Sequence, residues 1–259
     1  MLLAACRAPD VGPDPADTLT SWNGMDMVRI RAGTFTMGGG PGDATDYYAD
    51  SEVTLTRDFW IARTEVTVAE WLEDTTDSAD WDRDAVGCPD DACALDTVTW
   101  MEGARFLNWM SEGEGLPACH ESDGSAIASP YLTDPYSCPG YRFPTHAEWE
   151  YAAKAGEDTR WAGSDDNLLV AWTDENATSN QPGCLLEPNA YGLCDMSGNV
   201  LEWVSDWAES GRDDDADPEV DPVGPASSSQ DMRGNRGGAW WVDAGYATVT
   251  MRSRSHAEQ

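Results

Sequence analysis

Two carboxylates in the C-terminal half of the chain are spaced to bind a metal ion. Asp195 and Glu202 stand on either side of the turn Ser197-Gly198-Asn199. Such a turn can aim main-chain carbonyl oxygens toward the same point as the two carboxylates, and oxygen ligands of this kind suit a hard cation such as calcium. The alternative is that Glu202 only accepts a hydrogen bond from a neighbouring backbone N–H. The sequence therefore predicts a calcium site at this turn.

The cysteines are the second set of residues that could do chemistry. Apart from Cys6, they fall into three close pairs along the chain, which favours local disulfides. A zinc or copper site is the competing interpretation, but the chain has no C-x-x-C spacing and only 3 histidines. Because cytosolic thiols stay reduced, disulfides indicate an exported protein. The predicted pairs are Cys88 with Cys93, Cys119 with Cys138, and Cys184 with Cys194.

The N-terminus carries a possible lipidation site. Leu2-Leu3-Ala4-Ala5-Cys6 resembles the end of a bacterial lipoprotein signal, in which the cysteine becomes lipidated after cleavage. The charged and long apolar parts of such a signal are absent, so a clipped start and an accidental match both stay open. We expect an envelope lipoprotein, periplasmic or on the cell surface, that touches the membrane only through a lipid at Cys6.

Composition indicates a globular domain behind a short tether. Residues 7–25 are rich in Pro, Asp and Thr and are predicted to be a disordered tether, after a residual signal at 1–6 and before one domain at 26–259. The chain is 41% hydrophobic with 13 tryptophans, which is enough for a sizeable core. Its net charge of −33 argues against nucleic acid as a partner and favours a divalent cation. No apolar run is long enough to predict a transmembrane helix.

Alternating apolar and polar residues predict the strands. Residues 26–37 read as a hairpin that turns at Ala32-Gly33, and residues 53–55 and 59–61 as a second strand pair. Residues 247–252 alternate again and predict a last strand.

Three helix starts share one signature, a threonine followed three residues later by glutamate, which is a capping box. The second of these helices is expected to end at Gly113 and the third near Gly156. Together with the strands and the long loops, they predict an α+β domain with few regular elements and loops held by disulfides. The three signatures are Thr67 with Glu70, Thr99 with Glu102, and Thr145 with Glu148.

Seven stretches in order give the chain a resemblance to the formylglycine-generating enzyme (sulfatase-modifying factor) family. The resemblance covers nearly everything from Met27 to Arg254 and implies a C-type-lectin-like fold. It also implies that the chain stops short of the family's closing strand. The matching stretches are Phe35-Thr36-Met37-Gly38, Thr64-Glu65-Val66-Thr67, Val98-Thr99-Trp100 with Ala104, 141–152, Asn189-Ala190-Tyr191-Gly192-Leu193, 195–203 and Arg236-Gly237-Gly238-Ala239-Trp240.

Two sites of the family can be carried over residue by residue. For calcium, the resemblance implies the side chains of Asp195 and Glu202 and the carbonyls of Gly198 and Val200. For catalysis, oxidase members use two cysteines five residues apart, after the Arg-Gly-Gly motif, to hold copper(I). Those positions are Val242 and Ala247 here, and no cysteine follows Cys194, so we expect no copper.

The resemblance leaves three functions to compare. The leading one is an exported, non-catalytic, calcium-supported binding or scaffold module for a peptide, glycan or protein. Trp240 and Trp241 are then candidate ligand contacts, unless they fill the core. The alternative is a formylglycine-forming oxidoreductase that acts on protein cysteine. A third is a variable ligand-binding protein on the same fold. Ergothioneine-type sulfoxide synthases are excluded, because they need an additional histidine-rich helical domain.

Overall fold

The computed structural model describes residues 2–3, 6–7, 17–40, 50–74, 87–88, 90–128, 130–131, 134–208 and 218–257. These residues form three small sheets, with helices and long loops around them, as the α+β expectation requires. The first sheet has the order β1 (Leu2–Leu3), β8 (Glu202–Trp207), β10 (Met232–Arg236), β11 (Ser253–His256). The second has the order β2 (Cys6–Arg7), β7 (Phe59–Ala62), β4 (Asp26–Ile30), β3 (Thr18–Thr20), and the third β5 (Gly33–Met37), β6 (Ser51–Leu55), β9 (Glu219–Val220).

The three predicted capping boxes are confirmed. They begin α1 (Val68–Glu73), α2 (Trp100–Gly113) and α3 (His146–Lys154). In each box the threonine hydroxyl accepts the backbone N–H of the glutamate, and the glutamate carboxylate accepts the backbone N–H of the threonine. α3 ends at Ala155, whose positive φ of 48° turns the chain out of the helix. Two shorter helices, α4 (Asn167–Val170) and the 3-10 helix η5 (Ala244–Tyr246), lie in the later loops, and a further 3-10 turn, η4, spans Pro135–Ser137.

The predicted strands over residues 26–37 and 53–61 exist, but their pairing is different. β4 pairs with β7 and β5 pairs with β6, so the two chain segments form one long antiparallel ladder in place of two short hairpins. The ladder bends at Arg31-Ala32. Asp58 fills the gap there, because its carboxylate accepts hydrogen bonds from the Ala32 backbone N–H (2.8 Å) and from Arg29 Nε (3.0 Å). Beyond the bend β5 and β6 belong to the third sheet.

The strand expected over residues 247–252 is wrong. Those residues form turns, and the last strand is β11, at Ser253–His256. Ala247, Thr248, Val249 and Thr250 are all buried, whereas a strand at the surface would bury only alternate residues. Alternation in the sequence therefore did not correspond to alternation in burial at this place.

The disordered tether expected over residues 7–25 does not hold for its C-terminal part. Thr18–Thr20 form β3, which pairs with β4, and Met25 is 2% exposed in the core. Trp22 also donates from Nε1 to the carbonyl of Met110 in α2 (3.1 Å). The apolar side chains of Leu19, Trp22 and Met25 supply the packing that the polar composition of the segment conceals. Most of the remaining tether lies outside the described residues.

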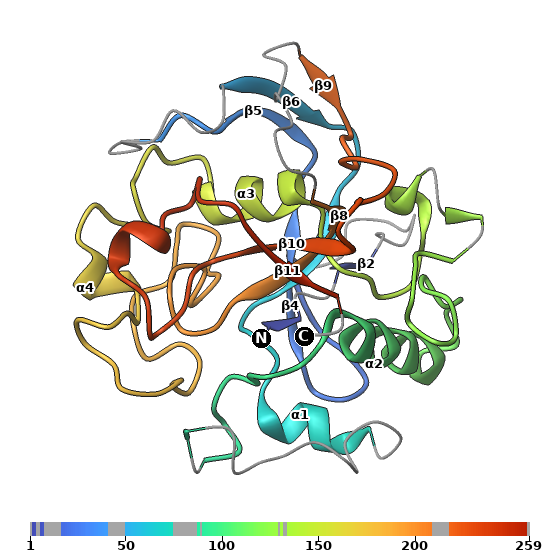
Figure 1. The fold of residues 1–259 in the computed structure, drawn as a ribbon, viewed down its shortest axis with the longest axis horizontal. Helices are drawn as coiled ribbons and strands as arrows, with labels where there is room; N and C mark the ends of the chain where they lie inside the picture. The colour runs from blue at the N-terminus through green and yellow to red at the C-terminus, as the bar shows by residue number, and fades with distance from the viewer. Residues whose placement is uncertain are drawn as a thin grey trace.

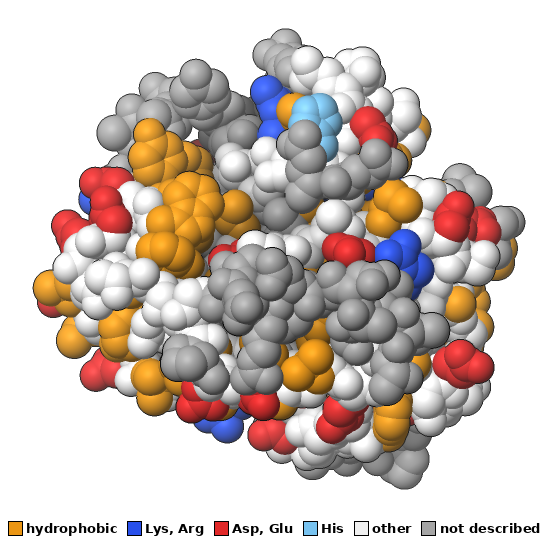
Figure 2. All heavy atoms as spheres, turned by 60° about the horizontal axis from the view of Figure 1, so that its bottom comes forward, with side chains coloured by type: hydrophobic (Ala, Val, Ile, Leu, Met, Phe, Trp, Pro, Cys, Tyr) orange, Lys and Arg blue, Asp and Glu red, His pale blue; other side chains and the backbone are white. Residues whose placement is uncertain are grey.

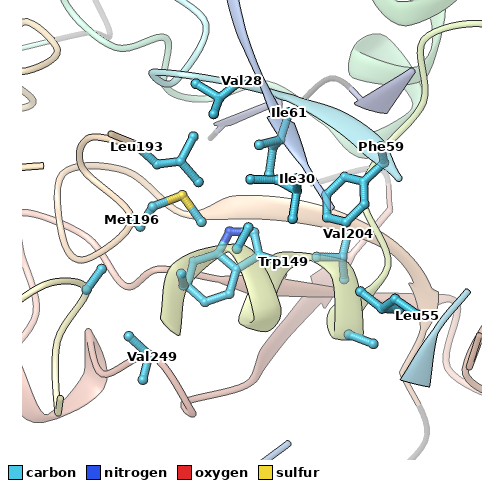
Figure 3. Packing of buried hydrophobic residues seen from close by; sticks show 14 of the residues in the cluster. Val28, Ile30, Leu55, Phe59, Ile61, Trp149, Leu193, Met196, Val204 and Val249 are labelled. Atoms are coloured by element: carbon cyan, nitrogen blue, oxygen red, sulfur yellow. The ribbon is translucent and has the colours of Figure 1, made fainter. Parts of the chain in front are cut away.

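The core is divided between two helices. α3 lies between the sheet of β5 and β6 and the sheet of β8 and β10, and contacts both (Figure 1). Its Trp149 points into a cluster formed by strands and loops, with Ile30, Phe59 and Val204 around it (Figure 3). α2 covers a second cluster, which includes Trp100, Phe106, Leu107, Met110, Tyr141, Phe143 and Trp203. The described residues include no helix with the length and hydropathy of a membrane span.

A buried ion pair joins α3 to β10. Glu150 of α3 and Arg236 of β10 are both fully buried and lie 2.9 Å apart, Oε2 to Nη2. The other carboxylate oxygen of Glu150 accepts the backbone N–H of Gly38 and contacts Lys154. Arg236 also donates from Nε to His146 Nδ1 (2.8 Å). The pair therefore links three segments that are distant in sequence.

Candidate functional site

The Asp195–Glu202 turn is fixed by backbone contacts on both sides. The Gly198 N–H donates to the carbonyl of Gly237 (2.7 Å), and the Asn199 N–H donates to the carbonyl of Trp172 (2.8 Å). Gly198 has a φ of 80°, and a Cβ there would overlap the Trp172 backbone, so the position requires glycine. Glu202 then begins β8, and its buried side chain lies beside Gly237.

A disulfide anchors the entrance to this turn. Cys184–Cys194 closes the loop immediately before Asp195, and the Cys184 N–H donates to Asp195 Oδ2 (2.7 Å). Cys88–Cys93 and Cys119–Cys138 are also bonded, so all three predicted pairs are confirmed. Three disulfides are typical of proteins in extracellular or periplasmic compartments.

A third carboxylate lies at the turn that the sequence did not assign to the site. Glu65, just after β7, accepts the Val200 N–H on Oε1 (3.1 Å) and the Asn199 side-chain amide on Oε2. It is 2% exposed, Asp195 is 4% exposed and Glu202 is 2% exposed. We call Glu65, Asp195 and Glu202 the acidic cluster. The signal available in the sequence was the position of Glu65 in Thr64-Glu65-Val66-Thr67, one of the stretches that carry the family resemblance.

No cation of the described chain compensates the acidic cluster. Among the described residues, no Lys, Arg or His forms an ion pair with any of its members. Among the described residues, the Glu202 carboxylate accepts one hydrogen bond, from Trp149 Nε1 to Oε2 at 2.6 Å. Burial raises the pKa of Glu202 to about 8 and that of Asp195 to about 6. Burial, with the neighbouring carboxylates Asp195 and Glu202, raises the pKa of Glu65 well above its usual range.

Some oxygen atoms at the turn lack hydrogen bonds and are suited to a cation. Asp195 Oδ1 is buried without a partner, and the carbonyls of Gly198 and Val200 accept no hydrogen bond from the described residues. No three acidic, histidine or cysteine side chains in the described ranges are already placed to hold a metal. The expected ligand set contains two carboxylates, of Asp195 and Glu202, and two main-chain carbonyls, of Gly198 and Val200. All four are oxygen ligands, so the residues present fit a hard cation.

In the segment after Arg236, the two candidate ligand tryptophans differ in burial. Trp240 is partly buried, packs against the main core cluster and donates its backbone N–H to the carbonyl of Asn199 (2.7 Å). Trp241 is 54% exposed. Ala247 is fully buried, and a Cβ on Gly238 would lie 2.7 Å from its Cα, so the segment is closely packed. Trp240 therefore helps to fill the core, whereas Trp241 is accessible to a ligand.

The lipidation prediction is only partly within the described structure. The backbone of Cys6 belongs to β2 and pairs with Ile61 of β7, and its side chain lies outside the described residues. Lipidation of Cys6 thus stays a prediction.

The acidic cluster predicts an unusual dependence of stability on pH in calcium-free buffer. A carboxyl with a raised pKa keeps its proton in the folded state after the unfolded chain has lost it, so stability falls as pH rises. For Glu202 this loss of stability falls in the pH range from 4.5 to about 8. Each unit of difference between the folded and unfolded pKa corresponds to about 1.4 kcal/mol in the free energy of unfolding. We expect Glu202→Gln to flatten the decline, measured by urea unfolding with chelator between these pH values.

A matched variant controls for the loss of a charge alone. Glu157→Gln removes an exposed carboxylate just after α3 and is expected to leave the pH dependence of the parent unchanged. If the parent gained stability across the same pH range, or if both variants gave identical profiles, the raised pKa of Glu202 would be rejected.

The mixed sheets, sparse helices and disulfide-held loops define a C-type-lectin-like fold. The model of the sulfatase-modifying factor enzyme 1-like domain matches residues 14–259, and the chain belongs to this family. This confirms the family and the fold that the sequence motifs predicted.

Relatives and solved structures agree with this assignment. The chain is 26% identical to the chaperone protein LppX of Paenibacillus barcinonensis over 269 residues, covering 90% of this chain and 84% of the relative. It is 28% identical to the formylglycine-generating enzyme of Streptomyces coelicolor over 295 residues, covering 95% and 88%. The structure of Treponema denticola variable protein 1 superposes with a TM-score of 0.75 at 26% identity, covering 97% and 94% of the two chains. PvdO from Pseudomonas aeruginosa shares the fold, with a TM-score of 0.69 at 21% identity and coverage of 95% and 94%.

Proposed function

We propose that this chain is a non-catalytic binding domain in which calcium at the Asp195–Glu202 turn stabilises the loops that carry the ligand surface. The observation that supports this most directly is the acidic cluster, buried and without a compensating cation among the described residues. A buried carboxylate must either hold a proton or meet a positive charge. Calcium would bind Asp195, Glu202 and the carbonyls of Gly198 and Val200, with Glu65 supporting the turn through Asn199 and Val200.

The cysteine content supports a binding role over oxidation. Each cysteine from Cys88 to Cys194 is in a disulfide, so none of these six offers a thiolate for copper(I). Val242 and Ala247 occupy the positions at which the resemblance places catalytic cysteines. The partner would be a peptide, glycan or protein that contacts the exposed Trp241.

The disulfides also support export, and Leu2-Leu3-Ala4-Ala5-Cys6 supports a lipid anchor at Cys6. In this proposal the protein faces an oxidising compartment of the cell envelope. The lipid is its membrane contact.

Calcium is expected to raise the melting temperature of the parent protein relative to the chelator-treated protein. Binding to the folded state alone stabilises by about 2.7 kcal/mol when free calcium is about 100 times Kd, which corresponds to a shift of several degrees. Asp195→Asn and Glu202→Ala should each lose most of that shift, because the first removes the negative charge of a ligand and the second removes a ligand altogether. Thermal unfolding followed by circular dichroism measures the effect.

Two controls make the calcium result specific. Glu157→Gln should keep the full shift, and magnesium should give a smaller one, since magnesium demands stricter geometry. The absence of a shift in the parent would remove the calcium site, and so would an equal shift in Asp195→Asn. Because Asp195→Asn keeps the size of the side chain, it serves if Glu202→Ala fails to fold.

The second candidate function is oxidation of a protein cysteine to formylglycine. The 28% identity to the formylglycine-generating enzyme of Streptomyces coelicolor, over 88% of that enzyme, favours it. The test is incubation with copper and a cysteine-containing peptide in air, followed by mass spectrometry for the aldehyde. We expect no aldehyde, and sustained turnover would replace the binding function with the oxidase.

A further inference from the structure

Two short helices present hydrophobic side chains to solvent on one side of the molecule. Leu168 and Leu169 of α4 are 52% and 43% exposed. Trp241, just before η5, and Tyr246, within it, are 54% and 58% exposed. We call these four side chains the α4–η5 surface. Figure 2 shows hydrophobic side chains gathered on the side of the molecule where α4 and η5 lie in Figure 1.

A small buried cluster holds the two parts of this surface together. Val170 and Ala171 at the end of α4 pack with Trp161 against Ala244 and Ala247. The Trp161 indole donates from Nε1 to the carbonyl of Ala244 (2.8 Å). The surface therefore stands on fixed backbone, and a ligand would not have to order it on binding.

Hydrogen bonds place acidic residues at the margin of the α4–η5 surface. Asp166 caps α4 by accepting the Leu168 N–H (3.1 Å), and Asp243 caps η5 by accepting the Gly245 N–H (2.8 Å). The Asp174 backbone N–H donates to the carbonyl of Val242 (3.1 Å), which brings Asp174 and its neighbour Glu175 to the same margin. All four acidic residues are exposed.

Arg160 reaches the edge of this margin beside Gly245 but, among the described residues, forms no ion pair with the four acidic residues. Its guanidinium lies over the Trp161 ring, 4.6 Å from the ring centroid. With a net charge of −33, two copies of the chain would repel each other, which disfavours self-association through this surface. The charge that complements an acidic margin around an apolar centre is positive.

We propose that the α4–η5 surface binds a cationic polypeptide segment whose apolar side chains pack on Leu168, Leu169, Trp241 and Tyr246. Lysine or arginine side chains of the segment would face Asp166, Asp174, Glu175 and Asp243. This rests on the proposed binding function and names the class of its partner. Apolar contacts supply most of the affinity and the acidic margin supplies orientation and rate of association.

The test uses a synthetic peptide in which lysines alternate with leucine and tryptophan, titrated against the full chain by isothermal calorimetry. We expect saturable binding that weakens as salt rises from about 0.05 M to about 0.5 M, because salt screens exposed charges. Leu168→Ser combined with Trp241→Ser should weaken binding by about tenfold or more, since central aromatic anchors dominate such interfaces. Asp174→Asn should weaken it less.

Matched probes decide the outcome. Val220→Ser removes a 65% exposed side chain from β9 and should leave binding unchanged. A peptide with glutamate in place of every lysine should not bind. Equal affinity of the two peptides overturns the proposal, as does equal affinity of the parent and the Leu168→Ser, Trp241→Ser variant. So does dimerisation of the parent through this surface in sedimentation equilibrium.

The calcium experiment and the peptide experiment test separate claims, so one claim can be rejected while the other stands. If calcium shifts the melting temperature but the cationic peptide does not bind, the partner class is wrong and the calcium-supported domain stands. If the peptide binds equally with calcium and with chelator and melting is unaffected, the calcium role fails while the α4–η5 surface stands.

Discussion

Replacing Glu150 with glutamine is expected to lower the free energy of unfolding by about 3–5 kcal/mol. The substitution removes the negative charge that faces Arg236, and neither side chain is exposed to solvent. Arg236 would keep its bonds to His146 and to the carbonyls of Val249 and Met251, but its buried charge would lose the carboxylate that lies against it. The cost comes from that buried charge more than from the lost hydrogen bond.

The charge state of Glu150 agrees with this expectation. Burial alone would raise its pKa, but Arg236, Lys154 and Arg252 outweigh burial and hold the pKa below its ordinary value of 4.5. A depressed carboxyl pKa gives stability that is present above the unfolded-state value and is lost as pH falls through the folded-state value. Glu150→Gln should therefore destabilise most near neutral pH.

Urea unfolding at neutral pH measures the loss, and an exposed ion pair provides the control. Arg57 and Asp134 lie 2.9 Å apart with side chains 45% and 43% exposed. Asp134→Asn is expected to cost at most about 1 kcal/mol, because water screens an exposed pair. If Glu150→Gln cost no more than Asp134→Asn, the pair would not be holding α3 to β10 as described.

Removing the Cys119–Cys138 disulfide should cost about 3 kcal/mol. The bond closes a loop of sequence separation 19, and closing a loop of this size restricts the unfolded chain. Among the described residues of the loop, regular structure is limited to short pieces such as an isolated bridge between His120 and Ile127 and the 3-10 turn η4. The loop therefore depends on the bond more than a helix or sheet would. Both cysteines are fully buried, so alanine is the suitable replacement.

The shorter disulfide is the internal comparison. Cys88–Cys93 has a sequence separation of 5, and removing it as a pair of alanines should cost about 1 kcal/mol less than removing Cys119–Cys138. Denaturant unfolding of the two double variants, with the other disulfides intact, measures both losses. An equal loss, or a larger one for the short loop, would contradict loop closure as the main source of stability.

The sequence predicted the local features well, because the responsible residues are neighbours. A capping box needs only a threonine and a glutamate three residues apart, and all three boxes formed. The disulfides followed from short spacings in the same way. The family came from motifs, each of which is a short run of residues.

Pairing and burial were harder, because they depend on distant segments. Alternation in residues 26–37 identifies which side chains share a face, but it does not say which strand lies alongside, so β4 and β5 were paired with each other wrongly. Glu65 was missed for the same reason, since it lies far in sequence from Asn199 and Val200, which donate to it. The exposure of Trp241 and the burial of Trp240 also depend on packing that no local pattern contains.

The bend at Arg31-Ala32 gives the domain a stiff corner. Both sides of the ladder, β4–β5 and β6–β7, pass through this bend. Asp58, between β6 and β7, accepts hydrogen bonds from Ala32 and Arg29 at the same point. To move the sheet of β5, β6 and β9 away from the rest, these bonds and the contacts of α3 with β5 and β6 would have to break. A pulling force on this sheet would therefore be transmitted through α3 to the buried ion pair of Glu150 and Arg236. We expect the sheet, α3 and this ion pair to come apart from the rest of the domain in a single step.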